Sequence, residues 1–486
     1  MRRSSLDEEL LSPVFGKDAE SNHRTRWFAD VIVPGIGLMQ DYYDLAVINL
    51  ARPLLSAQYG DLSATTEALV TASALVGSVV GMLVFGAGAD WIGRRRLFML
   101  CAILTGVGSA ASAAVYGRAA SVYRQLVFWR FVMGLGIGGE YPLSAAHSAE
   151  HVSGRGSGLR VTMVYATMGL GSLLSPGLCA LLLRIGLDGS VVWRALFGCG
   201  AFFSVLSFCA RFGLIEDAPK FQAAKRRREA SGDSPFRLLF FSEFASLIAS
   251  TSVSWFLYDV VSYGLALYSA EITPALGVGS SPLSRALGVL ALRALNLPGY
   301  VVAPFLPDLI GRRATLVCGF LGMAALLVVL ALLPERGAGG SSAALMLVLF
   351  GLQGVADAGG PGAATYLIPG EVFPSALRAS AHGTSAAMGK VGASVGAFVI
   401  PILVDALGMR RVFALCAAAS AFAALLGQIT LPNYDAETLD VLEDTYAAAG
   451  AAGVMSLLWR DRSAASASAQ RRRSLLSSLD DATDRF

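Results

Sequence analysis

The sequence predicts an all-α polytopic membrane protein with twelve transmembrane helices in two pseudo-symmetric halves of six. Of its 486 residues, 55% are hydrophobic and only 15% are charged, and the mean hydropathy is +0.59. Soluble domains carry about 25% charged residues, so this composition fits no soluble enzyme, and we expect no enzymatic activity. The net charge of +3 is too small for a nucleic-acid-binding protein. Regularly spaced apolar stretches and an internal repeat give the number and arrangement of the helices.

Apolar stretches of roughly 20 residues follow one another from about residue 31, and each is long enough to cross ~30 Å of hydrocarbon. The longest polar interruption, 216–240, lies between the sixth and seventh stretches and is basic. It separates an N-terminal half (31–215) from a C-terminal half (241–431). The twelve predicted spans are 31–54, 67–89, 96–116, 122–145, 159–183, 191–215, 241–270, 281–310, 313–333, 342–368, 380–405 and 410–431.

The loops and tails predict the orientation in the membrane. Placing both termini and the 216–240 loop in the cytoplasm gathers most loop arginines on that side, as the positive-inside bias requires. The N-terminal tail, 1–30, is polar and lacks the apolar segment of a signal peptide. We expect the C-terminal tail, 432–486, to be disordered, with phosphorylation sites among the serines beside Arg471–Arg473. The expected location is the plasma membrane.

The six cysteines are scattered through apolar runs without paired spacing. This distribution argues against a disulfide framework or a zinc site and favours cysteines packed as small hydrophobic residues. No metal and no cofactor are therefore expected.

An internal repeat relates the two halves. The segment Asp90-Trp-Ile-Gly-Arg-Arg95 follows the second span, and Asp308-Leu-Ile-Gly-Arg-Arg313 follows the eighth. In each, glycine permits a tight turn, while the aspartate can bind arginines or a helix N-terminus of the other half. Acid–arginine pairs after the fourth and tenth spans repeat at nearly the same offset. The residues predicted to form this cytoplasmic latch are Asp90, Arg94, Arg95, Glu150, Arg155, Asp308, Arg312, Arg313, Glu371 and Arg378.

This duplicated motif on twelve spans resembles the major facilitator superfamily. The resemblance implies two six-helix halves that rock about a central site, which gives alternating access. It says nothing about the substrate.

Ionisable residues inside the first and fourth spans are the candidate proton carriers, because charges in a membrane are costly and mark functional sites. Asp41 and Asp44 are three residues apart and share one helix face. Arg130 and Glu140 are ten residues apart, nearly three turns, so both can face one cavity. Three acids and one arginine suit a proton relay, although a structural salt bridge locking the two spans remains an alternative.

Polar residues on later spans are the candidate substrate ligands. Trp255, Asp259 and Tyr263 recur every four residues on the seventh span and form one stripe. The tenth span contains Asp357 in a glycine-rich run, and the eleventh contains Lys390. A lysine there suits an anionic substrate, or it neutralises Asp357; the sequence leaves both open.

Four segments resemble the phosphate:proton symporters of fungi and plants, in register through all twelve spans: Asp41-x-x-Asp44, residues 136–145, the stripe on the seventh span and Ser385–Lys390. The segment Gly-Gly-Glu140-Tyr141-Pro-Leu-Ser-Ala is the most specific, with glutamate where that family usually has aspartate. The resemblance implies symport of inorganic phosphate and protons by a protein that functions as a monomer in the lipid bilayer. It assigns proton coupling to Asp41, Asp44, Arg130 and Glu140, and phosphate binding to Tyr141, Trp255, Asp259, Tyr263 and Lys390.

Two positions depart from that family. Met168 stands where it has a glutamine and Gly362 where it has an asparagine, and both family residues donate hydrogen bonds to phosphate. Thr167 or Asp357 can compensate; alternatively, Gly362 makes room for an organic phosphate, another oxyanion or a sugar. A nutrient receptor that binds the substrate without transporting it is a further alternative. The acidic residues argue against it, because a receptor needs no proton path.

The segment His147-Ser-Ala-Glu150-His151 matches the H-x-x-E-H pattern of some zinc peptidases. It lies at the end of the fourth predicted span, where the family has a loop glutamate and no further ligand is evident. We therefore expect no zinc peptidase site.

Overall fold

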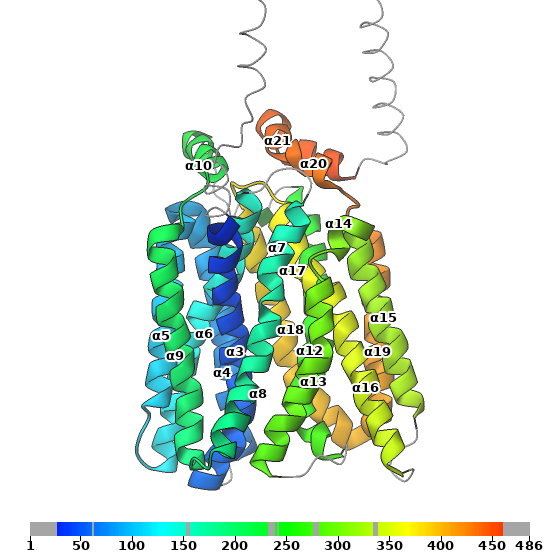
Figure 1. The fold of residues 1–486 in the computed structure, drawn as a ribbon. Coiled ribbons are helices and arrows are strands. Elements are labelled where there is room, and N and C mark those ends of the chain that lie inside the picture. Colours follow the sequence, from blue (N-terminus) through cyan, green and yellow to red (C-terminus); the bar gives the residue numbers. More distant parts are fainter. Residues whose placement is uncertain are drawn as a thin grey trace, which may run out of the picture.

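The computed structural model describes residues 27–60, 63–151, 156–231, 239–240, 243–275, 281–333 and 339–459. Regular secondary structure within these residues is helical throughout, and long helices stand side by side in one bundle (Figure 1). The predicted phosphorylation sites beside Arg471–Arg473 and nearly all of the 1–30 tail lie outside the described residues.

The N-terminal half contains six membrane-length helical segments. A short π-helical turn, η1, precedes the first, and the fifth is broken at Thr167, whose hydroxyl bonds back to the carbonyl oxygen of Val164 at 2.7 Å. The elements are η1 (Phe28–Ile32), α3 (Val33–Tyr59), α4 (Ala64–Ile92), α5 (Arg94–Ala113), α6 (Ala119–Glu150), α7 (Ser157–Ala166), α8 (Met168–Arg184) and α9 (Gly189–Leu214).

The C-terminal half repeats this arrangement. Its fourth segment is interrupted by a π-helical turn, η2, at Pro361, a residue that removes a backbone donor from the helix. The elements are α12 (Phe244–Ala275), α13 (Pro282–Val302), α14 (Leu306–Ile310), α15 (Arg312–Leu332), α16 (Gly339–Asp357), η2 (Ala358–Gly362), α17 (Ala363–Glu371), α18 (Arg378–Leu407) and α19 (Met409–Thr430).

The outer surface of the bundle is apolar. Ten of the described helical segments are long and apolar enough to cross a membrane. Helices α6 and α13 lie alongside them in the same bundle. Large side chains such as Phe202 (65% exposed), Phe212 (65%) and Ile429 (64%) point outward. Such exposure suits a helix bundle surrounded by lipid. The chain is a multi-pass integral membrane protein.

The two halves approach most closely where α4 crosses α18. A Cβ atom on Gly383 would lie 2.3 Å from the carbonyl oxygen of Met82, and one on Gly86 would lie 2.7 Å from that of Ala379. Small residues let helix backbones come into contact in membranes, where packing rather than water drives association. Glycine at 86 and 383 therefore sets the distance between the halves.

Both copies of the repeated motif form the same turn. Gly93 has φ +119° and Gly311 has φ +94°, a region that residues with a Cβ rarely adopt. The turn predicted from the motif is thus confirmed. Both turns lie at the end of the bundle that also carries α10 (Pro219–Ser231), which we call the latch end (Figure 1).

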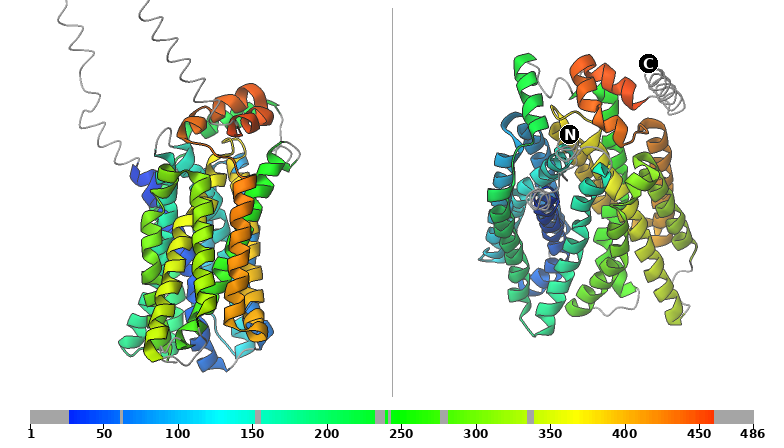
Figure 2. Two further views of the ribbon diagram at one scale, coloured as in Figure 1. Left: turned by 90° about the vertical axis from the view of Figure 1, so that its right-hand side faces the viewer. Right: turned by 45° about the horizontal axis from the view of Figure 1, so that its top comes forward.

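The prediction that the tail after residue 431 is disordered is wrong for its first part. Helices α20 (Ala436–Asp440) and α21 (Leu442–Leu458) lie across the latch end (Figure 2). Val454 and Leu458 are buried in the main apolar core, and Glu443 accepts a hydrogen bond from the Ser375 amide at 2.8 Å. The prediction relied on the high alanine and serine content of the tail, which does not reveal that a few of its residues pack against the bundle.

Candidate transport site

A pocket lies between the two halves and receives side chains from both. Tyr42, Tyr141 and Tyr165 come from the N-terminal half; α12, α13, α16 and α18 supply most of the rest. The residues of α12 that line it run from Trp255 to Ala266, so the pocket extends from the middle of the bundle away from the latch end. Pockets at such an interface are the usual substrate sites of transporters built from two repeats.

Lys390 is the cation at the centre of this pocket. Its Nζ lies 3.3 Å from Asp259 Oδ2 and donates a hydrogen bond of 2.7 Å to the Tyr263 hydroxyl. The same ammonium lies 5.0 Å from the ring centre of Tyr141. Lys390 is only 2% exposed and Asp259 1%. The structure thus pairs Lys390 with Asp259, a pairing that the sequence did not predict. Neutralisation of Asp357 by Lys390, which the sequence left open, is not found.

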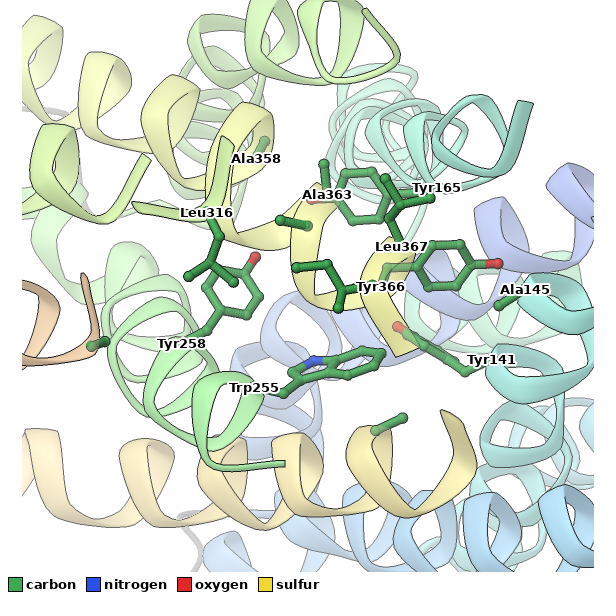
Figure 3. Packing of buried hydrophobic residues seen from close by; sticks show 14 of the residues in the cluster. Tyr141, Ala145, Tyr165, Trp255, Tyr258, Leu316, Ala358, Ala363, Tyr366 and Leu367 are labelled. Atoms are coloured by element: carbon green, nitrogen blue, oxygen red, sulfur yellow. The ribbon is translucent and has the colours of Figure 1, made fainter. Parts of the chain in front are cut away.

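Aromatic rings form the wall between this group and the latch end. The rings of Trp255 and Tyr141 lie 6.4 Å apart, and Tyr141 meets Tyr366 edge-on at 6.4 Å. Figure 3 shows these rings converging from helices of both halves. The Tyr141 hydroxyl has no hydrogen-bond partner among the described residues. It is therefore a donor available to a bound molecule.

Asp357 is a second carboxylate facing the pocket. Its Oδ2 accepts hydrogen bonds from Ser262 at 3.1 Å and from Tyr258 at 3.4 Å. Within the described part of the chain, Oδ1 has no hydrogen-bond partner. Arg293 of α13 lines the same pocket, 5.8 Å from the ring centre of Tyr42. Arg293 was not predicted, although it is an arginine inside the eighth predicted span, and the same signal identified Arg130 in the fourth.

The structure corrects two expectations about the family departures. The Thr167 hydroxyl faces α3, where it donates to the Gly35 carbonyl oxygen at 2.7 Å, so it does not compensate in the pocket. Gly362 does line the pocket, but it leaves no open space. A Cβ there would lie 2.2 Å from the Tyr165 hydroxyl and 2.7 Å from that of Tyr258. Two tyrosine hydroxyls fill the room that the alternative of a larger substrate requires.

Glu140 is held by a cation that the sequence analysis missed. Arg211 of α9 donates to Glu140 at 2.6 Å, and Ser144 donates to the same oxygen at 3.0 Å. Both charged side chains are buried. A Cβ on Gly37 would lie 2.1 Å from each of them, so the ion pair rests directly on the backbone of α3. Arg211 lies inside the sixth predicted span, where the rule applied to Arg130 would have found it.

Arg130 and Glu140 do not share one cluster. Arg130 donates to the Val70 carbonyl oxygen at 3.1 Å and is fully buried. Its acidic neighbour is Asp44, which accepts hydrogen bonds from Gln40 at 3.3 Å and Ser109 at 3.2 Å. The predicted relay therefore divides into a set around Asp44 and a set around Glu140.

Asp41 has charged neighbours in both of these sets and in the pocket. Its charged neighbours include Glu140, Arg211, Asp44 and Lys390. One of its oxygens has no hydrogen-bond partner among the described residues, although the side chain is buried. This position suits a group that exchanges a proton between the two regions.

At the latch end, Asp90 binds the first turn of α18 in the other half. It accepts hydrogen bonds from the amide and hydroxyl of Ser380 at 2.8 and 2.6 Å. Arg94 pairs with Asp90 at 3.0 Å and with Glu150 at 2.6 Å. Arg378 crosses to Glu150 at 3.9 Å.

The second copy makes the matching contact. Asp308 accepts a hydrogen bond of 3.0 Å from the Leu159 amide at the start of α7. Arg312 pairs with Asp308 at 2.9 Å and with Glu371 at 3.0 Å. The hydroxyl of Ser157 on the opposite half donates to Glu371 at 2.9 Å. Each half therefore places an aspartate on a helix N-terminus of the other.

Two of the predicted latch residues, Arg95 and Arg313, do not bridge the halves. Arg95 donates to the Phe212 carbonyl oxygen, and Arg313 reaches the carbonyl oxygens of Gln428 and Leu431. Both contacts stay within one half, so these two arginines anchor α9 and α19 rather than bridge the halves. Arg155 lies outside the described residues.

One group of side chains has the composition of a metal site. Asp30, His147 and His151 place one ligand atom each within 4.8 Å of one another at the latch end. Glu150, the acid of the H-x-x-E-H pattern, is instead bound by Arg94.

Comparisons with known proteins agree with this architecture. The family model of the Major Facilitator Superfamily matches residues 35–297, and that of sugar (and other) transporters matches residues 244–446. The probable inorganic phosphate transporter 1-12 of Oryza sativa subsp. japonica is 31% identical over 444 residues, which cover 77% of this chain and 82% of that protein. The inorganic phosphate transporter PHO84 of Saccharomyces cerevisiae is 28% identical over 449 residues, which cover 77% and 75%.

Among solved structures, the proton:xylose symporter XylE bound to 6-bromo-6-deoxy-D-glucose superposes with a TM-score of 0.76 at 20% identity. The match covers 87% of this chain and 99% of XylE. Two repeated six-helix halves, a polar pocket between them and a latch at one end define a membrane transporter of the rocking type. The chain belongs to the major facilitator superfamily.

Proposed function

We propose that this protein is a secondary active transporter that carries inorganic phosphate together with protons. The observation that carries the proposal is the buried group of Lys390, Asp259 and Tyr263, which faces the pocket between the halves. The two relatives named as inorganic phosphate transporters support it. We further propose the plasma membrane as its location, with the latch end in the cytoplasm and a monomer as the working unit.

The pocket offers both kinds of partner that dihydrogen phosphate needs. Lys390 and the Tyr141 hydroxyl donate to phosphate oxygens, and the ammonium balances the negative charge. Asp259 Oδ1 has no hydrogen-bond partner in the described part of the chain, so it accepts from a phosphate hydroxyl. Sulfate carries no such hydroxyl at neutral pH and is repelled by the carboxylate.

The pocket around Gly362 favours a small anion over a larger one. The Tyr165 and Tyr258 hydroxyls occupy the space beside this glycine, so the pocket has no room there for a larger substrate. Met168 lines the pocket and supplies no donor. Losing one hydrogen bond of this kind costs about 1 kcal/mol, which lowers affinity several-fold without changing the substrate class.

The proton couples to this site through Asp41 and Glu140. Protonating Glu140 would weaken its pairing with Arg211, and the freed guanidinium lies against the α3 backbone next to Asp41. Asp41 in turn neighbours Lys390, so its charge alters the field at the anion site. When the proton site and the anion site are both occupied, the halves can rock and the latch can open.

The test is uptake of labelled phosphate by the purified full chain in proteoliposomes with an imposed inward proton gradient. We expect accumulation of labelled phosphate that stops when an ionophore collapses the gradient. Unlabelled phosphate should compete with the labelled phosphate, whereas sulfate, glycerol phosphate and xylose should not. Asp259→Asn is expected to abolish gradient-driven uptake, whereas Arg313→Lys, at a partly buried arginine away from the pocket, is the matched control.

Three results would contradict the proposal. Uptake that is independent of the gradient excludes symport. If the protein does not take up phosphate, phosphate is not its substrate. Saturable phosphate binding without flux identifies a receptor.

A further inference from the structure

We propose that Asp30, His147 and His151 bind one divalent transition-metal cation of the Zn²⁺ type at the latch end of the N-terminal half. This site is separate from the pocket and from the proton-carrying residues, and the proposal does not depend on the transported substrate.

The geometry brings three metal-ligating side chains together from two elements. His147 and His151 are four residues apart at the end of α6, so they share one helix face, and their ring centres lie 4.2 Å apart. Asp30 comes from η1, the turn before α3, and its Oδ1 lies 3.6 Å from His147 Nε2. That separation is too long for a hydrogen bond. It suits two atoms that share a metal ion.

The hydrogen bonding of the two histidines leaves ring nitrogens available. His151 Nδ1 lies 2.8 Å from the His147 carbonyl oxygen, a contact that fixes the ring and leaves Nε2 for a metal. His147 is only 1% exposed, and neither of its ring nitrogens has a hydrogen-bond partner among the described residues. A buried imidazole without a partner is unusual in a folded protein. Coordination of a metal would satisfy it.

Two imidazoles and one carboxylate are ligands that Zn²⁺ accepts, with a water molecule as the fourth ligand. Metal–ligand bonds of about 2.0 Å imply ligand atoms about 3.3 Å apart in a tetrahedron. The three ligand atoms lie within 4.8 Å of one another in this structure. Small side-chain movements would bring them to the spacing that a metal ion needs.

Neighbouring charges do not oppose a cation here, because they are already compensated. The two nearby guanidinium groups, those of Arg94 and Arg211, are paired with Glu150 and Glu140. The pairing of Glu150 also removes the general base of a zinc peptidase, so the site binds metal without hydrolytic chemistry. A bound ion would tie the start of α3, which carries Asp41, to the end of α6, which carries Glu140.

The experiment measures Zn²⁺ binding to the purified, metal-stripped full chain in detergent, by competition with a chromophoric chelator, and Co²⁺ binding by visible absorption. We expect one equivalent of metal, with a Co²⁺ spectrum typical of four-coordinate nitrogen and oxygen ligation. Asp30→Asn and His151→Ala should each weaken Zn²⁺ binding by at least tenfold. Zn²⁺ should raise the Tm of the native chain and not that of the His147→Ala/His151→Ala double variant.

His23→Ala is the matched control, because it removes another histidine of the same chain and should leave the affinity unchanged. A Tm measured in chelator and a single peak in size exclusion establish that each variant is folded. The proposal is wrong if the folded double variant binds Zn²⁺ as tightly as the native chain, or if affinity depends on His23 instead.

Discussion

Asp90 at the end of α4 accepts two hydrogen bonds from Ser380 at the start of α18, one from its amide at 2.8 Å and one from its hydroxyl at 2.6 Å. The carboxylate belongs to one half of the bundle and the serine to the other. This contact and its counterpart between Asp308 and Leu159 join the two halves at the latch end.

Asp90→Ala should therefore open the latch end. Hydrogen bonds to a charged group contribute about 1.5–3 kcal/mol each, so a loss of about 2 kcal/mol shifts the equilibrium roughly 30-fold towards the open state. Asp308→Ala should have a smaller effect, because the Asp308 side chain is 27% exposed whereas that of Asp90 is fully buried. Distances between spin labels at the exposed positions Arg96 and Leu309 report the change. Equal shifts for both variants would contradict this ranking.

Gly383→Val should hold the latch end open by a different route. Its side chain would meet the Met82 carbonyl oxygen, which already lies 2.3 Å from the position of a Cβ, and a backbone atom cannot give way as a flexible side chain does. The expected result is a long distance between the two labels and transport below a tenth of the native rate. Gly213→Val, at a glycine with open space around it, should change neither. Normal closure in the Gly383 variant would refute the close-approach argument.

Removing Arg211 should damage both stability and transport. Arg211→Leu leaves the Glu140 carboxylate buried without its cation, and breaking a buried pair in this way costs about 3–5 kcal/mol. We expect a markedly lower Tm in detergent and no gradient-driven uptake. The double variant Arg211→Leu/Glu140→Gln carries no unpaired charge, so it should regain most of the Tm while remaining unable to couple to protons. If both variants have equally low Tm values, the ion pair is not the cause.

Gly362→Asn tests how the pocket has adapted. Although it introduces the asparagine of the phosphate symporters, its Cβ would collide with the Tyr165 and Tyr258 hydroxyls. We expect phosphate uptake to fall at least tenfold. Adding Tyr165→Phe removes the nearer hydroxyl and should restore part of the rate, a favourable coupling that a double-mutant cycle measures. Full activity of Gly362→Asn alone would mean that the tyrosines move freely.

The order of the helices could be predicted from the sequence, because membrane spans need long apolar runs and a repeated motif marks equivalent positions. The stripe of Trp255, Asp259 and Tyr263 was predictable for a similar reason, since its members are local neighbours on one helix. Lys390 is different: periodicity cannot say which of two acids on other helices it meets, and only the packing of α12 against α18 joins it to Asp259.

Other features depend on contacts between distant segments. Arg211 and Arg293 were visible as arginines in apolar runs, but their partners were not. Open space beside Gly362 was one of the alternatives, because a glycine has no side chain, whereas Tyr165 from the other half fills it. Helix α21 was expected to be disordered from its composition, and its docking through Glu443 is a tertiary contact.

Helix α18 contributes Ser380 to the latch, Gly383 to the crossing with α4, and Lys390 to the pocket between the halves. Ten residues of helix separate the first from the last, about 15 Å along its axis. Because a helix transmits displacement with little compression, any shift of Lys390 along this axis would also move Ser380. If the proposed anion binds at Lys390, binding of substrate and opening of the latch would therefore be coupled through one rigid helix, with no further moving part between them.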